Sequence, residues 1–165
     1  RDAERLAVNS ASVAANPPTT SEAPRYTPPA PAPGIEIDGS LIKSALEVAL
    51  ASGLSEPRLR FGDLTIYFAP ADGRNAGQVY VKLNRRYIGR LDGTRFIPDR
   101  DYPALGEENK KALVENLRAI AHDPAAAARN HGIATRKCSC CGLRLSDPVS
   151  VNRGVGPDCA ERWGF

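Results

Sequence analysis

Four cysteines near the end of the chain have the spacing of metal ligands. They are Cys138, Cys140, Cys141 and Cys159. The segment Cys138-Ser-Cys-Cys141-Gly142 contains a C-x-x-C-G turn, which directs two thiolates to one point, and Gly142 permits the backbone conformation that such a turn requires. Cys159 follows 18 residues after Cys141. We therefore predict a structural zinc ion bound by Cys138, Cys141 and Cys159.

The fourth zinc ligand is left open by the sequence. Pro157 can begin a short helix, and a second ligand is expected one helical turn after Cys159, but position 162 is Arg. Two candidates remain. Cys140 lies inside the turn, where a side chain usually points outward, and His131 precedes a glycine and could reach back toward the site. The predicted metal ligands are thus Cys138, Cys141, Cys159 and Cys140, with His131 as the alternative to Cys140.

Other uses of cysteine fit this pattern less well. A disulfide scaffold of a secreted domain needs cysteines spread along the chain, whereas here the first 137 residues contain none. A redox dithiol is expected inside a thioredoxin-like strand–turn–helix unit and does not need the distant Cys159. Zinc binding therefore explains the cluster better than either alternative.

The same segment resembles a known family. Asp123-Pro-Ala-Ala-Ala-Ala-Arg-Asn-His-Gly132 is followed by C-x-x-C-G-x-x-L-S-D-P-x-S-x-x-x-G-x-G-P-x-C. This stretch is similar to a zinc-binding cysteine domain of unknown function at the C-termini of phage and actinobacterial proteins, with the pattern C-x-x-C-G-R-x-L-T-D-P-x-S-x-x-x-G-I-G-P-x-C. Leu143 and Ser146 depart from that pattern. The resemblance implies a phage protein, in some cases joined to helicases or other DNA-processing modules, and implies no activity.

The elements that position these residues can be predicted from periodicity and turn signals. Helices are expected at residues 41–50 after a cap at Asp38, at 107–121, and from Pro124 to Asn130. Short alternating segments separated by Gly-Asp and Asp-Gly turns indicate strands at residues 58–61, 64–68, 78–83, 87–91 and 94–97. The expected fold class is α+β, a small antiparallel β-meander with packed helices plus a C-terminal treble-clef-like zinc module.

Composition suggests four regions along the chain. Residues 1–34 are rich in Pro and Ala and predict a disordered linker. Residues 35–103 form the expected helix and sheet module, and residues 104–134 a helical connector. Residues 135–165 form the zinc-binding module. The chain contains no Met and begins with Arg1, so we expect it to be a fragment of a longer protein or a processed product, with an upstream domain among its candidate partners.

Positive charge concentrates on the predicted sheet. The chain has a net charge of only +3, but residues 58–95 hold eight basic residues against three acidic ones, whereas residues 1–57 hold four against seven. Period-two alternation puts the apolar side chains of the strands on one face and polar ones on the other. The predicted nucleic-acid-binding residues are Arg58, Arg60, Tyr67, Arg74, Tyr80, Lys82, Arg85 and Arg86.

Three classes of function follow from these features. Basic side chains interleaved with tyrosines predict a noncatalytic accessory module that binds DNA or RNA, with phosphates on the cations and bases on the rings. The alternative is an adaptor that docks on a protein partner as part of a larger DNA-processing protein. An enzyme would need an open zinc position holding water, because no phosphate loop or Ser, His and acid cluster is present.

The location of the protein can also be predicted. No run of about 18 apolar residues and no signal peptide is found in the sequence. Together with the clustered cysteines and the phage resemblance, this predicts a cytoplasmic protein of a bacterial host cell with no membrane partner.

Overall fold

The computed structural model describes residues 33–165, which combine one antiparallel sheet with five α-helices and confirm the α+β class. The predicted linker, residues 1–34, lies outside the described residues except for its last two. Residues 33–165 belong to one compact unit.

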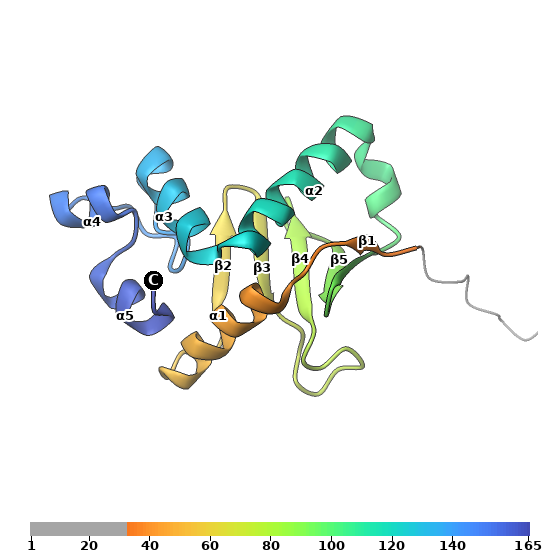
Figure 1. Ribbon diagram of the computed structural model, residues 1–165, viewed down its shortest axis with the longest axis horizontal. Helices are drawn as coiled ribbons and strands as arrows, with labels where there is room; N and C mark the ends of the chain where they lie inside the picture. Colours follow the sequence, from red (N-terminus) through yellow and green to blue (C-terminus); the bar gives the residue numbers. More distant parts are fainter. Residues whose placement is uncertain (1–32) are drawn as a thin grey trace, which may run out of the picture. The chain divides into compact units, whose positions relative to one another are not determined.

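All strands of the sheet pair with antiparallel neighbours, in the order β1-β6-β5-β4-β3-β2 (Figure 1). The strands are β1 (Ile35–Glu36), β2 (Arg58–Phe61), β3 (Leu64–Phe68), β4 (Val79–Leu83), β5 (Arg86–Asp92) and β6 (Arg95–Pro98). The five predicted strands are therefore confirmed to within one residue at each end. The sixth, β1, was not predicted, since a two-residue strand is too short to show alternation.

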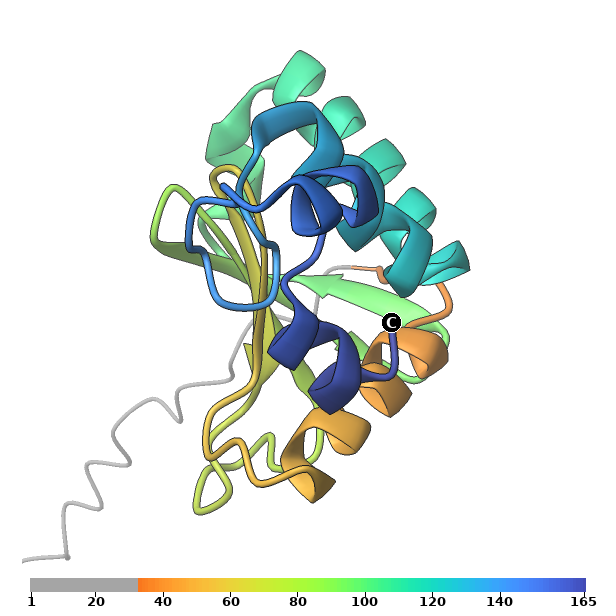
Figure 2. The same ribbon diagram turned by 90° about the vertical axis from the view of Figure 1, so that its left-hand side faces the viewer.

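The longer helices lie on one side of the sheet (Figure 2). The helices are α1 (Ser40–Ala51), α2 (Glu107–His122), α3 (Pro124–Thr135), α4 (Pro148–Arg153) and α5 (Pro157–Trp163), with a 3₁₀ turn at Tyr102–Leu105. Alternation explains this arrangement, because Leu59, Ile66 and Val81 all point to the helix side and are fully buried. The predicted apolar face is confirmed.

The cysteine-rich segment shares the core of the sheet. Val155 and Trp163, which come from the last part of the chain, belong to the same buried cluster as Leu46 of α1, Ile66 of β3 and Leu117 of α2. Helix α5 packs directly against α1. The predicted boundaries at 103/104 and 134/135 thus fall inside one continuous core.

Local differences from the predicted helices have identifiable causes. Helix α3 continues past Asn130 to Thr135 and ends where Arg136 adopts the left-handed conformation. Helix α4 is not among the predicted helices. Its N-terminus is capped by Asp147, whose carboxylate accepts a hydrogen bond from the backbone N–H of Ser150 at 2.9 Å.

Two glycines let α3 and the end of α4 approach within backbone contact. A Cβ atom added to Gly132 would overlap the backbone of Gly154, and one added to Gly154 would overlap the carbonyl of Arg129. Gly154 also has a φ of +77°, which L-residues rarely adopt. The crossing therefore requires glycine on both sides.

We expect Gly132→Ala and Gly154→Ala each to destabilise the protein. Because the neighbouring atoms are backbone and cannot rotate away, the free energy of unfolding should fall by about 2–3 kcal/mol in urea denaturation. Gly156→Ala is the matched control, since no atom lies within 4 Å of its added Cβ and its φ is −66°. A loss in the control as large as in Gly132→Ala would contradict the close crossing.

Candidate metal centre and basic sheet face

Three of the four predicted cysteine ligands converge on one point. The Sγ atoms of Cys138, Cys141 and Cys159 all lie within 4.8 Å of one another. Among the described residues, 33–165, no other group of three or more His, Cys, Asp or Glu side chains lies close enough together to hold a metal ion. Cys138 is buried, Cys159 is half-buried and Cys141 is exposed, so the site lies at the surface with its first ligand in the core.

The turn that presents Cys138 and Cys141 is held by backbone hydrogen bonds. The N–H of Gly142 donates to the carbonyl of Cys138 at 2.7 Å, and the N–H of Cys138 donates to the carbonyl of Leu143 at 2.9 Å. Gly142 has a φ of +77°, as predicted from the C-x-x-C-G pattern. The neighbouring thiols of Cys140 and Cys159 are the main causes that lower the pKa of Cys138, and the nearby backbone N–H groups of Gly156 and Cys141 lower it further, as expected of a site that stabilises thiolates.

Cys140 points inward beside the cluster. Its side chain is 6% exposed and the neighbouring thiols of Cys138 and Cys159 raise its pKa, but its Sγ does not belong to the group of three that lie within 4.8 Å of one another. Without a cation the sulfurs cannot all be charged. Hydrogen bonds from Cys140 and Cys159 lower the pKa of Cys138, whereas donation to Cys138 raises the pKa of Cys140 far above its usual range and that of Cys159 to about 12. A bound divalent cation would neutralise the thiolates together.

The alternative ligand, His131, has a different environment. Its ring packs edge-on against Phe61 of β2, with the ring centroids 5.6 Å apart. Burial is the main cause that lowers its pKa, followed by the nearby charge of Lys137. Like Cys140, His131 is not part of the three-cysteine group. This packing against the sheet gives His131 a structural role that requires no metal.

A small hollow of 240 Å³ borders the cysteine site from outside. Cys141 and Cys159 line it together with Arg144, Asp147 and Asp158. This hollow is the space that a water or substrate would occupy if the metal kept an open position. The site thus has two geometric alternatives, a fourth sulfur from Cys140 on the inside or an oxygen ligand on the outside.

Arg60 connects the cysteine turn to the sheet. Its backbone N–H donates to the carbonyl of Ser139 at 2.7 Å, and its guanidinium Nη1 donates to the carbonyl of Cys140 at 2.8 Å. These bonds place the turn against the free edge of β2. Sequence reasoning grouped Arg60 with the nucleic-acid-binding residues, but its guanidinium is engaged with the cysteine turn.

Four other predicted residues meet on the face of the sheet opposite the core. Arg58 pairs with Tyr67 across β2 and β3, and Tyr67 pairs with Tyr80 across β3 and β4. The Arg58 guanidinium lies 5.3 Å and the Lys82 ammonium 5.0 Å from the centroid of the Tyr67 ring. We call Arg58, Tyr67, Tyr80 and Lys82 the aromatic strip. A salt bridge of 2.7 Å to the exposed Glu56 offsets part of the Arg58 charge.

A β-bulge adds two residues to the aromatic strip. Tyr80 lies opposite Arg90 and Lys82 opposite Tyr87, because the register shifts between Val81 and Lys82. The rings of Tyr80 and Tyr87 are 4.7 Å apart, and Tyr87 hydrogen-bonds to the Arg90 side chain. Strict alternation would put residues 87 and 90 on opposite faces of the sheet. Gly89, which suits a bulge, is the only sequence signal that Tyr87 and Arg90 could share a face.

The remaining predicted cations lie at the ends of the strands. Arg74 is in the loop between β3 and β4. Arg85 and Arg86 are exposed at the turn between β4 and β5, where Asn84 and Arg85 both have positive φ. Hence the structure gathers the tyrosines with Arg58 and Lys82 on one face of strands β2 to β5 and places these three arginines at the ends of the strands.

Comparison with known families identifies the cysteine segment. Residues 128–164 match a family of unknown function, DUF6011. The matched residues begin inside α3 and include all four cysteines. No curated protein and no solved structure matches the chain. This match confirms one part of the resemblance noted from the cysteine pattern, namely that the segment is similar to a family of unknown function.

Within residues 33–165, no helix is long and apolar enough to cross a membrane.

Proposed function

We propose that Cys138, Cys140, Cys141 and Cys159 bind one structural zinc ion. The mutual approach of the Cys138, Cys141 and Cys159 sulfurs supports three of these ligands. The buried Cys140 thiol, which is close enough to Cys138 and Cys159 to shift their pKa values, supports the fourth. Four thiolates suit zinc, which prefers tetrahedral sulfur coordination in structural sites. In this proposal the inward-pointing Cys140 closes the site, so no position remains for catalysis.

The arrangement of the ligands supports a treble-clef-like module. Three ligands come from the turn at residues 138–141, and the fourth, Cys159, lies in the first turn of α5. An isolated antiparallel bridge between Lys137 and Arg144 joins the two arms of the turn. The departure from a typical treble clef is that α5 supplies one ligand and the turn supplies three.

We infer that this zinc module belongs to a noncatalytic, phage-encoded accessory protein that binds nucleic acid through its sheet. The aromatic strip is the observation that carries this proposal. It combines three tyrosine rings in a row, with Tyr80 in contact with both Tyr67 and Tyr87, and flanking cations on one sheet face. Sheets that bind single strands use the same combination, with bases stacked on rings and phosphates held by Arg and Lys.

The zinc turn contributes to this surface indirectly. Through its two bonds to Arg60, the turn fixes the edge strand β2, which also carries Arg58 of the aromatic strip. An edge strand without a neighbour frays more readily than a paired one. Zinc binding would therefore help to keep Arg58 beside Tyr67.

Binding of single-stranded DNA or RNA is expected to weaken steeply with salt. If three or four phosphates are neutralised, the logarithm of the association constant should fall with the logarithm of salt concentration with a slope of about −2 to −3. Fluorescence anisotropy with a labelled oligonucleotide from low to physiological salt measures this slope.

The charge-matched control is Arg118→Ala, which removes an exposed cation from α2 on the other side of the sheet. Lys82→Ala should make the salt slope less negative by the amount expected for the loss of about one phosphate contact. Arg118→Ala should leave the salt slope unchanged. Absence of binding at low salt would contradict the proposal and leave the protein adaptor as the better alternative.

A further inference from the structure

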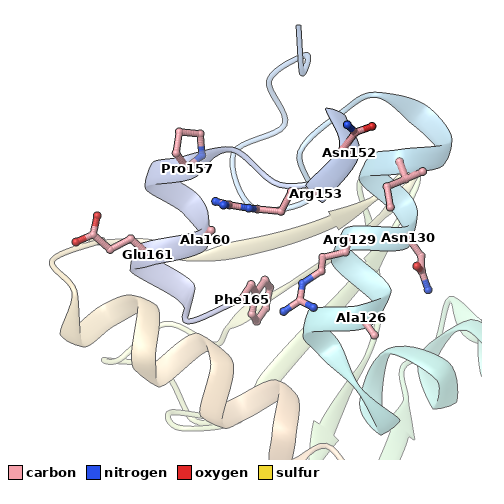
Figure 3. Close-up of a pocket in the computed structure, with 10 residues that line it drawn as sticks. Ala126, Arg129, Asn130, Asn152, Arg153, Pro157, Ala160, Glu161 and Phe165 are labelled. Carbon is pink, nitrogen blue, oxygen red and sulfur yellow. The ribbon is translucent and has the colours of Figure 1, made fainter. Parts of the chain in front are cut away.

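A groove between α3, α4 and α5 presents two arginines that the zinc site and the aromatic strip do not use. The groove has a volume of 770 Å³ and is lined by residues of all three helices. Figure 3 shows Arg129 reaching into it from α3 and Arg153 from the end of α4, both directed toward the space beside α5. Two guanidinium groups from separate elements thus enter one groove.

These two charges are not balanced inside the groove. Among the described residues, neither guanidinium has an acidic partner within 4.0 Å. Glu161 also lines the groove, but its carboxylate points away from both arginines on the outer side of α5 (Figure 3). Like charges that converge repel each other, so an anion between them would be stabilised.

The glycine crossing sets the spacing of the two arginines. The carbonyl of Arg129 is the atom against which Gly154 packs, and Arg153 immediately precedes Gly154. The backbone of each arginine is therefore anchored to that of the other. A pair of donors held in this way binds an anion at less entropic cost than two freely moving side chains.

The rest of the groove suits the other parts of a nucleotide. Ile133 is 51% exposed and Phe165 half-buried, so the groove offers apolar surface to a planar base. Asn130 and Asn152 add side-chain amides at its rim, and amides can donate to and accept from the edge of a base. The groove thus combines cations for a phosphate with apolar and amide groups for a base.

We propose that this groove binds a nucleotide, with its phosphate held by Arg129 and Arg153. Guanidinium groups bind phosphate oxygens through two parallel hydrogen bonds, which gives the contact both strength and direction. Helices α3, α4 and α5, which line the groove, lie on the helix side of the sheet (Figure 2), whereas the aromatic strip is on the opposite face. The nucleotide bound in the groove is therefore separate from the bases that would stack on the aromatic strip. Either proposal can be contradicted without affecting the other.

Adenosine monophosphate is the probe, and isothermal titration calorimetry of the whole chain measures its binding. Arg129→Ala and Arg153→Ala should each weaken binding at least about tenfold, because each removes a charge-assisted hydrogen-bond pair. Arg162→Ala removes an exposed cation from α5 that does not line the groove, and it should leave affinity unchanged. Unaltered Trp163 fluorescence in each variant shows that the fold is retained.

Two further experiments test the proposal. Adenosine, which lacks the phosphate, should bind at least about tenfold more weakly than the monophosphate. If a single-stranded oligonucleotide displaces adenosine monophosphate from the groove, the ligand is a nucleotide within a strand. If it does not, the ligand is a free nucleotide. Lack of binding, equal binding of adenosine, or affinity that survives both arginine substitutions would overturn the proposal.

Discussion

Chelation of zinc, or the substitution Cys138→Ser, is expected to unfold the region around α4 and α5 and destabilise the whole domain. Zinc in small structural sites binds with roughly 10 kcal/mol of apparent free energy, which is comparable to the total stability of a small domain. Trp163, the single tryptophan, is 2% exposed in the shared core. Its fluorescence should shift to longer wavelength as water reaches the ring, and the midpoint of thermal unfolding should fall.

The choice of ligands gives this prediction its controls. Cys140→Ser should lose zinc as Cys138→Ser does, because Cys140 is the proposed fourth ligand. His131→Ala should retain zinc, since the His131 ring packs on Phe61. Full zinc content in Cys140→Ser with loss in His131→Ala would exchange the roles of these two residues.

Replacing Tyr67 and Tyr80 by alanine together is expected to weaken single-strand binding by at least about thirtyfold, since each stacked base contributes about 1–3 kcal/mol. The two rings contact each other edge-to-face at 5.9 Å and are only partly buried, so they are available to bases. Anisotropy titration at constant low salt measures the loss.

Phenylalanine provides the matched substitution for each tyrosine. Tyr67→Phe and Tyr80→Phe keep the stacking surface, although the second loses the hydrogen bond that the Asn75 amide donates to the Tyr80 hydroxyl at 3.0 Å. We expect both to bind within a few-fold of the unaltered protein. Equal losses in the phenylalanine and alanine variants would show that the rings do not stack bases.

Much of the sheet could be predicted because its strands obey two simple rules. The apolar residues of β2, β3 and β4 alternate strictly, and glycine–aspartate pairs mark turns at Gly62-Asp63 and Asp92-Gly93. Likewise, the approach of Cys138 and Cys141 follows from short-range spacing, since a C-x-x-C-G turn determines its own geometry. Local patterns were sufficient for these parts.

The remaining features depend on contacts between distant residues. The approach of Gly132 to Gly154 is a tertiary contact between segments that show no periodicity in common. The engagement of Arg60 with the cysteine turn spans 80 residues. The inward direction of Cys140 follows from the packing of the turn against the core, so the sequence alone left His131 open as an alternative to it.

The coordination of the metal tests the central claim most directly. X-ray absorption at the zinc edge of the purified protein should show one zinc per chain with four sulfur neighbours at about 2.3 Å and no oxygen. That result would establish the closed site formed by Cys138, Cys140, Cys141 and Cys159. Three sulfurs with an oxygen ligand, placed toward the hollow beside Cys141 and Cys159, or protein that holds no zinc, would contradict it.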